Sequence, residues 1–510
     1  MYWNQNRAVF FIGLISACLA ASAEVAIPQN PEWEPIADDV YLQESVEHIS
    51  TEYPLTVVAV FEGAVFAGHD NGVARLTGSD LIPEQGPKSR AVRLRVINDS
   101  LLLLDGEGLW RRDKGSWTLI HAGSFVDVCD HLGQLIAASP EQVYRLAGEA
   151  MTPLLAAPGG QPILGVQSYS ETVYVRHEQA VGFVKGDRLE YNEVNDWGNL
   201  PLGSLIRDMT TISNRMVVAT DRGLAILRGA SWHIAGGPEG LCYEDTTCVA
   251  KGFAQDFWIG TTKGAVRAID DDYQYFGNGR WLPNEKVNAI AAGEGAVYIA
   301  TEGGLSIISY APYTLQKKAA WYKEQMKAWN MIRLGTVTGL TRNADGTYTR
   351  FIGDNDIGFT CHYLNGLCFE YAVTRDPVVR AEAVDIFKTV KWSEEITGIK
   401  GYPARAIYAV GEDARKTEWG SAGRAAEYHE TEDGKWVWKG DTSSDEIVAQ
   451  YYTVSLFHDL VAEGVEKEAA KEHLQRMTDH IIDNGWALID VDGKPTVWAQ
   501  WSPEFIYSPD

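Results

Sequence analysis

The chain has 510 residues, a formal net charge of −25 at pH 7, 45% hydrophobic residues and 22% charged residues. This composition is that of a well-packed globular protein rather than a disordered one, and the length predicts at least two domains or one large repeat domain. The acidic charge argues against a nucleic-acid partner, because binding a phosphate backbone needs clustered Lys and Arg.

Residues 1–23 have the features of a signal peptide. A lone Arg7 precedes an apolar run, and Ala21-Ser22-Ala23 supplies a small-residue cleavage site. An alternative cleavage site is Ile15-Ser16-Ala17-Cys18, which resembles a bacterial lipobox and would leave the protein lipid-anchored through Cys18. No later stretch reaches the roughly 18 consecutive apolar residues of a membrane span. We therefore expect a periplasmic or secreted protein without a membrane span.

An internal repeat occupies residues 56–312, after a lead segment of residues 24–55. Each unit has an apolar run, a small-residue turn, a second apolar strand and a third strand, and the units start about 33 to 43 residues apart. That period is typical of a four-stranded propeller blade, so the repeat predicts a seven-bladed β-propeller. The units are VVAVFEGAVFAGHDNGVARL, LRVINDSLLLLDGEGLWRR, DVCDHLGQLIAASPEQVYRL, GVQSYSETVYVRHEQAVGFV, DMTTISNRMVVATDRGLAIL, CVAKGFAQDFWIGTTKGAVRAI and AIAAGEGAVYIATEGGLSII.

The last three units carry a more specific pattern. Their fragments VATDRGLAILRGASWHI, FWIGTTKGAVRAI and VYIATEGGLSII resemble the propeller repeats in the sensor domains of bacterial two-component regulators. In that family the W-x-G-T-x-x-G signature places glycine at the turn between the second and third strands, where a positive φ is needed. The resemblance implies the fold more than the function, because such repeats occur in ligand sensors and in enzymes.

The hydrophobic period changes to that of helices over residues 313–510. We predict helices in QKKAAWYKEQMKAWNMI, FTCHYLNGLCFEYAVT, PVVRAEAVDIFKTVKWSEEIT, the segment after GDTSSDE, and EKEAAKEHLQRMTDHIIDNGW, the last ending at Asn484-Gly485. The succession of DNDIGFTCHYLNGLCFEYAVTRDP, TGIKGYPARAI, WKGDTSSDEIVAQYY and NGWALIDVDGKPTVWAQWSPE resembles the first part of an α/α-toroid domain of the six-hairpin glycosidase kind.

The resemblance implies stacked helical hairpins and an incomplete toroid, since a full ring needs about twelve helices. We therefore expect a multidomain β plus α protein in which the toroid is truncated or completed by a second polypeptide. An incomplete ring would expose apolar helix flanks.

Five cysteines remain apart from Cys18. Cys242 and Cys248 flank a short loop that a disulfide could close in an oxidising compartment, or both stay reduced. Cys361 and Cys368 read as buried thiols, because seven helical residues separate them by about 10 Å. No spacing suits zinc, and the sequence indicates no metal and no cofactor.

The run GDTSSDE at residues 440–446 starts a predicted helix. Ser443 and Glu446 have the S-x-x-E spacing of a capping box, and Asp445 would favour the positive end of the helix dipole. Asp441, Thr442 and Ser444 are not explained by this role. In toroids of the resembled kind the loops before the inner helices line the cavity, so the run would lie at a pocket as well.

Glycoside hydrolysis needs two carboxyl groups about 5 to 9.5 Å apart. The candidates for this role are Asp356, before the first inner-type helix, and Asp441 or Asp445; their alternative role is in turns and caps. His362, one turn into the helix, is either a proton carrier or a satisfied rim histidine.

Substrate contacts are expected from Tyr363, next along the same helix, and from Arg405. Arg405 could bind a carboxylate-bearing sugar or form a structural ion pair. The chain has 17 tryptophans, and Trp498 and Trp501, with Glu504 nearby, form either a stacking platform for a sugar ring or an apolar closure.

Two classes of function follow. One is an exported carbohydrate-active enzyme, a glycoside hydrolase or polysaccharide lyase, acting in the helical domain. The other is a non-catalytic binding protein whose propeller recruits a glycan or another extracytoplasmic partner.

Overall fold

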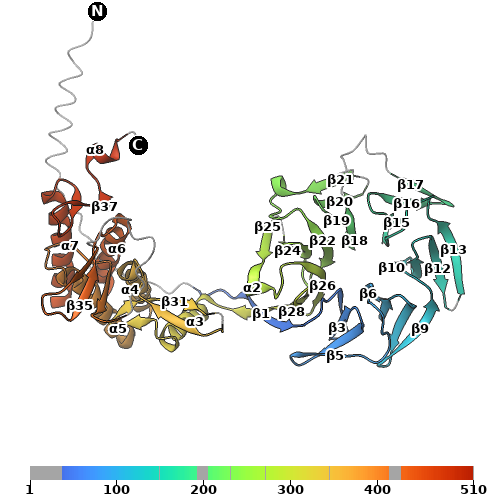
Figure 1. Cartoon of the computed structure of the whole chain (residues 1–510), viewed down its shortest axis with the longest axis horizontal. Coiled ribbons are helices and arrows are strands. Elements are labelled where there is room, and N and C mark those ends of the chain that lie inside the picture. Colours follow the sequence, from blue (N-terminus) through green and yellow to red (C-terminus); the bar gives the residue numbers. More distant parts are fainter. Residues whose placement is uncertain are drawn as a thin grey trace, which may run out of the picture. The chain divides into compact units, whose positions relative to one another are not determined.

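The structure is a computed structural model that describes residues 37–148, 150–191, 205–229, 231–269, 272–343, 345–412 and 427–508. The expected signal peptide and Cys18 lie outside these residues. The chain divides into two compact units, one of them Val40–Tyr313 and the other containing Thr314–Asp510 (Figure 1). Within the described part of the chain, no helix is long and apolar enough to cross a membrane.

Within its described residues, the Val40–Tyr313 unit contains seven four-stranded antiparallel sheets. Six of them use four consecutive strands, and the last has the order β1-β28-β27-β26. The strands of the first three sheets are β2 (Val57–Phe61), β3 (Ala64–His69), β4 (Gly72–Thr77), β5 (Asp80–Pro83), β6 (Arg93–Ile97), β7 (Ser100–Leu104), β8 (Gly108–Asp113), β9 (Ser116–Ala122), β10 (Asp127–His131), β11 (Gln134–Ala138), β12 (Gln142–Ala147) and β13 (Ala150–Ala156).

The other sheets are built in the same way. Short helices η1 (Gly237–Glu239) and α2 (Asn278–Trp281) lie in two of their connections. The strands are β14 (Gly165–Tyr169), β15 (Thr172–Arg176), β16 (Val181–Lys185), β17 (Arg188–Tyr191), β18 (Ile206–Ile212), β19 (Arg215–Thr220), β20 (Gly223–Arg228), β21 (Ser231–Ala235), β22 (Thr246–Lys251), β23 (Phe257–Thr261), β24 (Gly264–Ile269), β25 (Asp272–Phe276), β26 (Val287–Gly293), β27 (Ala296–Thr301), β28 (Gly304–Tyr313) and β1 (Tyr41–Ser50).

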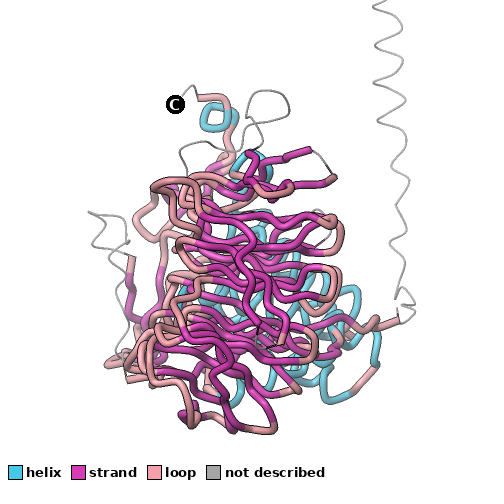
Figure 2. The backbone as a smooth tube through the Cα atoms, turned by 90° about the vertical axis from the view of Figure 1, so that its right-hand side faces the viewer, coloured by secondary structure: helices cyan, strands magenta, loops and turns pink. Residues whose placement is uncertain are grey.

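The sheets form a ring, which is the arrangement of a β-propeller. The first strand of each sheet contacts the first strand of the next, from β2 with β6 through to β22 with β26, and β26 contacts β2. Figure 1 shows the sheets arranged radially, and Figure 2 shows this unit from its edge with strands in magenta. The core lies between neighbouring sheets: Val217 of β19 and Ile259 of β23, for example, belong to one buried cluster.

The last sheet joins the two ends of the unit. β1 pairs antiparallel with β28, from Tyr41 opposite Tyr313 to Ser50 opposite Gly304. Residues 41–50 therefore belong to a sheet, although the sequence analysis assigned residues 24–55 to a lead segment. The repeat did not reveal β1, because this strand precedes the first complete unit and has no second strand of its own beside it in the sequence.

In three of the propeller sheets, a threonine side chain stabilises the turn between the second and third strands of the repeat unit. The Thr301 hydroxyl donates to the Gly304 carbonyl and accepts from the N–H two residues on. Thr220 and Thr261 make the same pair of bonds. Gly304 has a φ of +129°, and a Cβ there would lie 2.1 Å from the Ile49 carbonyl oxygen. These contacts confirm the role that the sequence signature assigned to the glycine of this turn.

The second unit contains all five predicted helices, and it also contains short sheets that the sequence did not predict. The helices are α3 (Leu315–Ala328), α4 (Asp356–Thr374), α5 (Pro377–Glu395), α6 (Ser444–Leu460) and α7 (Val465–Asp483), followed by the single turn α8 (Pro503–Ile506). The strands are β29 (Ile332–Arg333), β30 (Thr336–Val337), β31 (Gly339–Arg342), β32 (Tyr348–Phe351), β33 (Ala406–Ala409), β34 (Tyr428–Glu430), β35 (Trp436–Lys439), β36 (Ala487–Ile489) and β37 (Pro495–Gln500).

Two helical hairpins form the centre of this unit. α4 contacts α5 and α6, and α7 contacts α6 and α5. Their shared core contains Phe387 stacked on Phe457 and the buried Cys361 and Cys368, as expected. All five described cysteines are free thiols, so no disulfide closes the loop between Cys242 and Cys248.

Candidate functional site

The starts of α4 and α6 are joined by one arginine. Arg405 Nη1 donates to the Asp441 carbonyl (3.1 Å), and its Nη2 donates to Asp354 Oδ2 (2.9 Å). Both Nε and Nη2 also donate to the Asn355 side-chain oxygen, at 3.1 and 2.5 Å. The Arg405 side chain is 7% exposed, so it holds two helix starts together. We call Asp354, Asp356, Arg405, Lys439, Asp441 and Glu446 the helix-start cluster.

Strand pairing brings these residues together. β33 pairs with β35, and the Arg405 N–H just before β33 donates to the carbonyl of Lys439 at the end of β35. The chain then turns at Asp441, whose φ is +49°, and enters α6. The Asp441 carboxylate accepts from the Val497 N–H of β37 at 2.8 Å, and its own N–H donates to Asp490. Asp441 thereby ties the β36–β37 hairpin to the start of α6.

Asp356 is the first residue of α4 and is 1% exposed. Its Oδ1 accepts the Gly353 N–H at 2.9 Å. Burial raises the pKa of Asp356 to about 7, and the Gly353 hydrogen bond and the charge of Arg333 only partly oppose this shift. Near neutral pH this carboxyl is therefore a mixture of protonated and ionised forms.

Glu446 is also 1% exposed, and neither of its oxygens has a hydrogen-bond partner of standard geometry among the described residues. Its carboxyl packs against α4, where a Cβ on Gly358 would lie 2.9 Å from Oε1. Burial raises the pKa of Glu446 to about 8; Arg405 and the nearby Gly358 N–H oppose the shift, and the carboxylates Asp445 and Asp356 add to it. Glu446 is thus predominantly protonated at neutral pH.

The predicted capping box does not form. Ser443 is the N-cap of α6, but it makes no side-chain cap bond and its hydroxyl has no partner within the described ranges. Glu446 turns toward the start of α4 instead of back to its own N-cap. The expectation was wrong because the S-x-x-E spacing allows this bond without requiring it, and tertiary packing decided the orientation of the glutamate.

The cations of the cluster are occupied by protein acceptors. Lys439 is 2% exposed, and its Nζ contacts Asp354 and lies 3.7 Å from Glu427. Burial lowers the pKa of Lys439. Arg333, which also influences Asp356, pairs with Glu412 and donates to the Ile407 carbonyl at 3.1 Å. A substrate carboxylate would have to displace these acceptors.

The structure thus brings Asp356, Asp441 and Arg405 to one region. Asp445 and His362 are exposed on α6 and α4. Tyr363 donates from its hydroxyl to Glu382 of α5 (2.5 Å), so its polar end is engaged between α4 and α5.

The expected aromatic platform is split. Trp498 is 57% exposed and directly follows Val497, whose N–H binds Asp441. Trp501 is partly buried against the core that contains Tyr402. Glu504 is exposed in α8. Of these three residues, Trp498 is the one that neighbours a residue bonded to the helix-start cluster.

Sequence reasoning did not single out Lys439, and it assigned Glu446 to a capping box instead of to the site. The sequence held no signal for the burial of Glu446, because the residues at i+4 and i+7 on its helix face, Gln450 and Thr453, are polar although the structure buries them fully.

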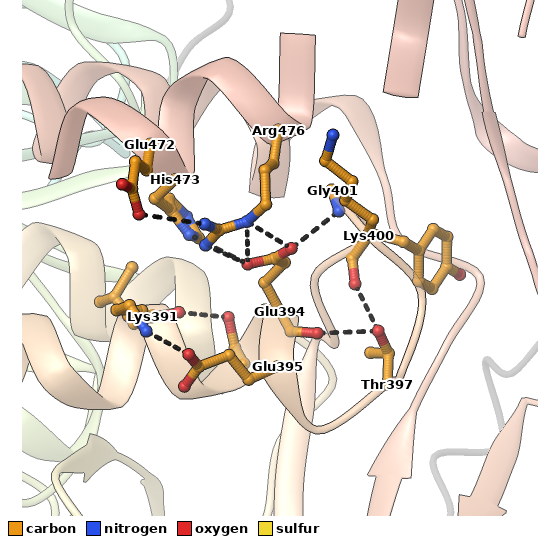
Figure 3. A network of polar contacts seen from close by, with 12 residues as sticks. Lys391, Glu394, Glu395, Thr397, Lys400, Gly401, Glu472, His473 and Arg476 are labelled. Atoms are coloured by element: carbon orange, nitrogen blue, oxygen red, sulfur yellow. Dashed lines mark hydrogen bonds and ion pairs between the residues drawn. The ribbon is translucent and has the colours of Figure 1, made fainter. Parts of the chain in front are cut away.

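A second buried carboxylate serves as a reference (Figure 3). Glu394 at the end of α5 accepts from Arg476 of α7 at 2.6 and 3.0 Å and from the Gly401 N–H at 2.8 Å. His473 lies 3.7 Å away. Burial alone would raise the pKa of Glu394, but His473, Arg476 and the Gly401 N–H lower it to about 2. This carboxylate is fully compensated and ties three chain segments together.

Within the described ranges, no group of three or more His, Cys, Asp or Glu side chains has the geometry to hold a metal ion. A carboxyl that is protonated at neutral pH, and whose pKa is raised further by the charge of a second carboxyl, is an arrangement that general acid–base catalysis uses.

No protein-family model matches the sequence, and the search of curated proteins found no match. Among solved structures, a virginiamycin B lyase from Staphylococcus aureus aligns at 10% identity and a TM-score of 0.44, over 53% of this chain and 99% of the lyase.

Two further structures are similar at the same level. The extracellular domain of a hybrid two-component system from B. thetaiotaomicron aligns at 12% identity and a TM-score of 0.44, over 52% of this chain and 40% of that one. PorZ, a surface component of the type-IX secretion system of Porphyromonas gingivalis, aligns at 11% identity and a TM-score of 0.36, over 53% of this chain and 39% of that one. Similarity this low carries no information about activity.

Proposed function

We propose that this protein is an extracytoplasmic carbohydrate-active protein whose helix-start cluster acts on a glycan, as a glycoside hydrolase or a polysaccharide lyase. The observation that carries the proposal is the pair of buried carboxyls, Asp356 and Glu446, with pKa values raised to about 7 and about 8. Glycosidic cleavage needs one carboxyl that donates a proton and one that is ionised. The signal-like residues 1–23 support export.

The proposed architecture is a complete seven-bladed propeller joined to part of an α/α toroid. Contact between β26 and β2, and the pairing of β1 with β28, support closure of the propeller. The stacking of the α4–α5 hairpin on the α6–α7 hairpin supports a toroid segment, because α4 lies beside α6 and α5 beside α7.

In this proposal Glu446 is the proton donor and Asp356 is its ionisable partner. Asp441 and Arg405 are positioning residues, since their polar groups bind neighbouring backbone and side chains. Trp498 supplies an exposed face on which a sugar ring stacks. Asp445 and His362 line the accessible flank of α6 and α4.

The test uses the full chain and isosteric variants. Asp356→Asn and Glu446→Gln are assayed for release of reducing ends and of unsaturated products from neutral and acidic polysaccharides. We expect both variants to fold and to lose about 10²-fold or more of the turnover. Asp385→Asn, which changes an exposed carboxylate paired with Lys388 on α5, is the matched control and should keep wild-type turnover.

Turnover that is unchanged in both site variants would assign the carboxyl pair a structural role. If the wild-type chain neither binds nor cleaves any glycan of the panel, the proposal is wrong as a whole.

The alternative is a non-catalytic glycan- or partner-binding protein. The observation that favours it is the 1% exposure of both carboxyls, which leaves no access for a substrate in this conformation. In that case Trp498→Ala abolishes glycan retention in an affinity gel, whereas Asp356→Asn leaves it unchanged.

A further inference from the structure

The inner strands of the propeller carry a cluster of buried charges. The central cluster consists of Arg93 and Arg95 on β6, Asp127 on β10, Arg176 on β15 and Asp208 on β18. Arg93 Nη1 lies 3.2 Å from Asp208 Oδ1, although β6 and β18 belong to sheets that are three positions apart in the ring. Figure 1 shows β6, β10 and β18 at the inner edge of the ring. The contact therefore crosses the centre of the propeller.

The two aspartates hold the arginines in place. Asp127 lies 3.5 Å from Arg93 Nε and 3.2 Å from Arg95 Nη2. Burial would raise the pKa of Asp127, but Arg95, Arg93 and Arg176 together lower it. Asp208 also accepts the Val249 N–H at 3.1 Å. The oxygens of both aspartates are shared between the arginines and backbone N–H groups.

The cations of the central cluster outnumber its anions. Three arginines face two aspartates, and Arg176 donates to neutral acceptors, the carbonyls of Ile206 (2.8 Å) and Leu164. Burial and then repulsion from Arg93 lower the pKa of Arg176 to about 10, despite the two aspartates. Arg207 does not change this balance, because it is paired with Asp245 at 2.6 Å. Among the described residues, the central cluster therefore carries an excess of one positive charge, in a chain whose net charge is −25.

The Nε–H group of Arg93 in this cluster has no hydrogen-bond acceptor among the described residues. This nitrogen is buried, and its contact with Asp127 is an ion pair too long for a hydrogen bond of good geometry. The side chains of Arg93 and Arg95 are nevertheless 21% and 22% exposed. A buried excess charge is costly unless it is compensated, and the partial exposure of these two side chains leaves them open to an anion from solvent.

We propose that the centre of the propeller is a binding site for a singly charged carboxylate, held by Arg93 and Arg95. Arg95 already binds Asp127 through both Nε and Nη2, so the ligand would share the guanidinium groups with the two aspartates. One negative charge balances the cluster, whereas a phosphate dianion would overcompensate. Free small carboxylates, the C-terminus of a peptide and uronic acids share this chemistry. The site does not depend on the proposed activity of the helical unit.

The test measures binding to the full chain by isothermal titration at constant ionic strength, with chloride as the reference anion. The probes are acetate, glucuronate, and one short peptide prepared with a free and with an amidated C-terminus. We expect saturable binding of the carboxylates and at least tenfold weaker binding of the amidated peptide than of the free one. The probe that binds most tightly identifies the source of the carboxylate.

The variant Arg95→Gln removes the excess charge while Asp127 keeps Arg93 as a partner, and should weaken carboxylate binding at least tenfold. Arg111→Gln, which alters the exposed Arg111–Asp113 pair on β8, is the matched control and should bind as wild type. Equal affinity of Arg95→Gln and wild type, or no saturable binding of any carboxylate, would overturn the proposal. If Arg95→Gln does not fold, equal binding of the free and amidated peptides by the wild-type chain overturns it.

Discussion

The centre of the propeller and the helix-start cluster both bury ionisable side chains, with opposite balances of charge. In the propeller three arginines surround two aspartates, and the pKa of Asp127 is lowered. In the helical unit Arg405 and Lys439 are occupied by other acceptors, and burial raises the pKa values of Asp356 and Glu446. The central cluster has more positive than negative groups, whereas the two buried carboxyls of the helix-start cluster are partly or mainly protonated at neutral pH.

The Glu394 network shows what a balanced cluster looks like. Arg476, His473 and the Gly401 N–H surround Glu394 and lower its pKa to about 2. A compensated carboxylate stabilises the fold, and its oxygens are already occupied by protein donors, so they are not available to a ligand. An uncompensated buried group lowers stability and is retained where function needs it. The balance of buried charge thus separates structural networks from candidate sites within one chain.

Removing the balanced carboxylate should have the largest effect on stability. Glu394→Gln leaves Arg476 and His473 without their shared anion, and a shift of the carboxylate pKa from 4.5 to about 2 corresponds to about 3 kcal/mol. Hydrogen exchange of peptides from α5 and α7 measures the loss. Glu395→Gln, at the neighbouring half-exposed carboxylate paired with Lys391, is the control and should change stability by less than about 0.5 kcal/mol.

The pH dependence of this contribution has a defined direction. The folded-state pKa of Glu394 is depressed, so its stabilisation is fully present above about pH 4.5 and is lost as the pH falls toward about 2. The wild-type chain should therefore lose protection in α5 and α7 over this acidic range, and Glu394→Gln should lose less. Equal acid sensitivity of the two proteins would contradict the assignment.

Removing an uncompensated carboxyl should raise the stability of the protein, in contrast to the loss expected for Glu394→Gln. The folded-state pKa of Asp356 is raised from 3.8 to about 7, so folding favours its protonated form and stability falls as the pH rises through this range. Asp356→Asn keeps an acceptor for the Gly353 N–H and should stabilise the helical unit, by about 2 kcal/mol more at pH 8 than at pH 5. Hydrogen exchange of the α4 peptides measures this gain, with Asp385→Asn as the control. A loss of stability at pH 8 would show that the carboxylate is compensated after all.

The propeller could be predicted from the sequence because its information is local and repeated. Each unit carries its own strands and its own turn, and the glycine of the turn, such as Gly304, is needed both for its φ of +129° and for the lack of a Cβ. β1 could not be found in this way, since its pairing with β28 closes the ring through a contact between distant residues. The charges at the centre were missed for the same reason: Arg93 and Asp208 are 115 residues apart.

The candidate site was predictable only in part. Asp356 and Asp441 were singled out because they precede or begin helices, and Arg405 as a cation for a carboxylate. The structure brings the three together through β33–β35 pairing, which the sequence did not reveal. Glu446 was assigned to a local motif, although its burial follows from the packing of α6 on α4. Local spacing identifies which bonds are available, but only the tertiary contacts determine which of them form.

The smallest expected effect on stability is that of Ser443→Ala, which tests directly whether the N-cap bond that the local spacing allows is formed in α6. Ser443 is the N-cap of α6, yet its buried hydroxyl makes no bond. Ser443→Ala should therefore change the free energy of unfolding by less than about 0.5 kcal/mol, because a hydroxyl without a partner contributes no hydrogen bond. Hydrogen exchange of the α6 peptides is the measurement.

The matched control is the N-cap of α5. Asp376 accepts the Val378 N–H at 2.8 Å, so Asp376→Ala should cost about 1 kcal/mol. A loss of about 1 kcal/mol in Ser443→Ala as well would restore the capping box and return Glu446 to its own helix start. That result would also remove Glu446 from the pair with Asp356, because one carboxyl cannot bond the N-cap of α6 while it packs against Gly358 of α4.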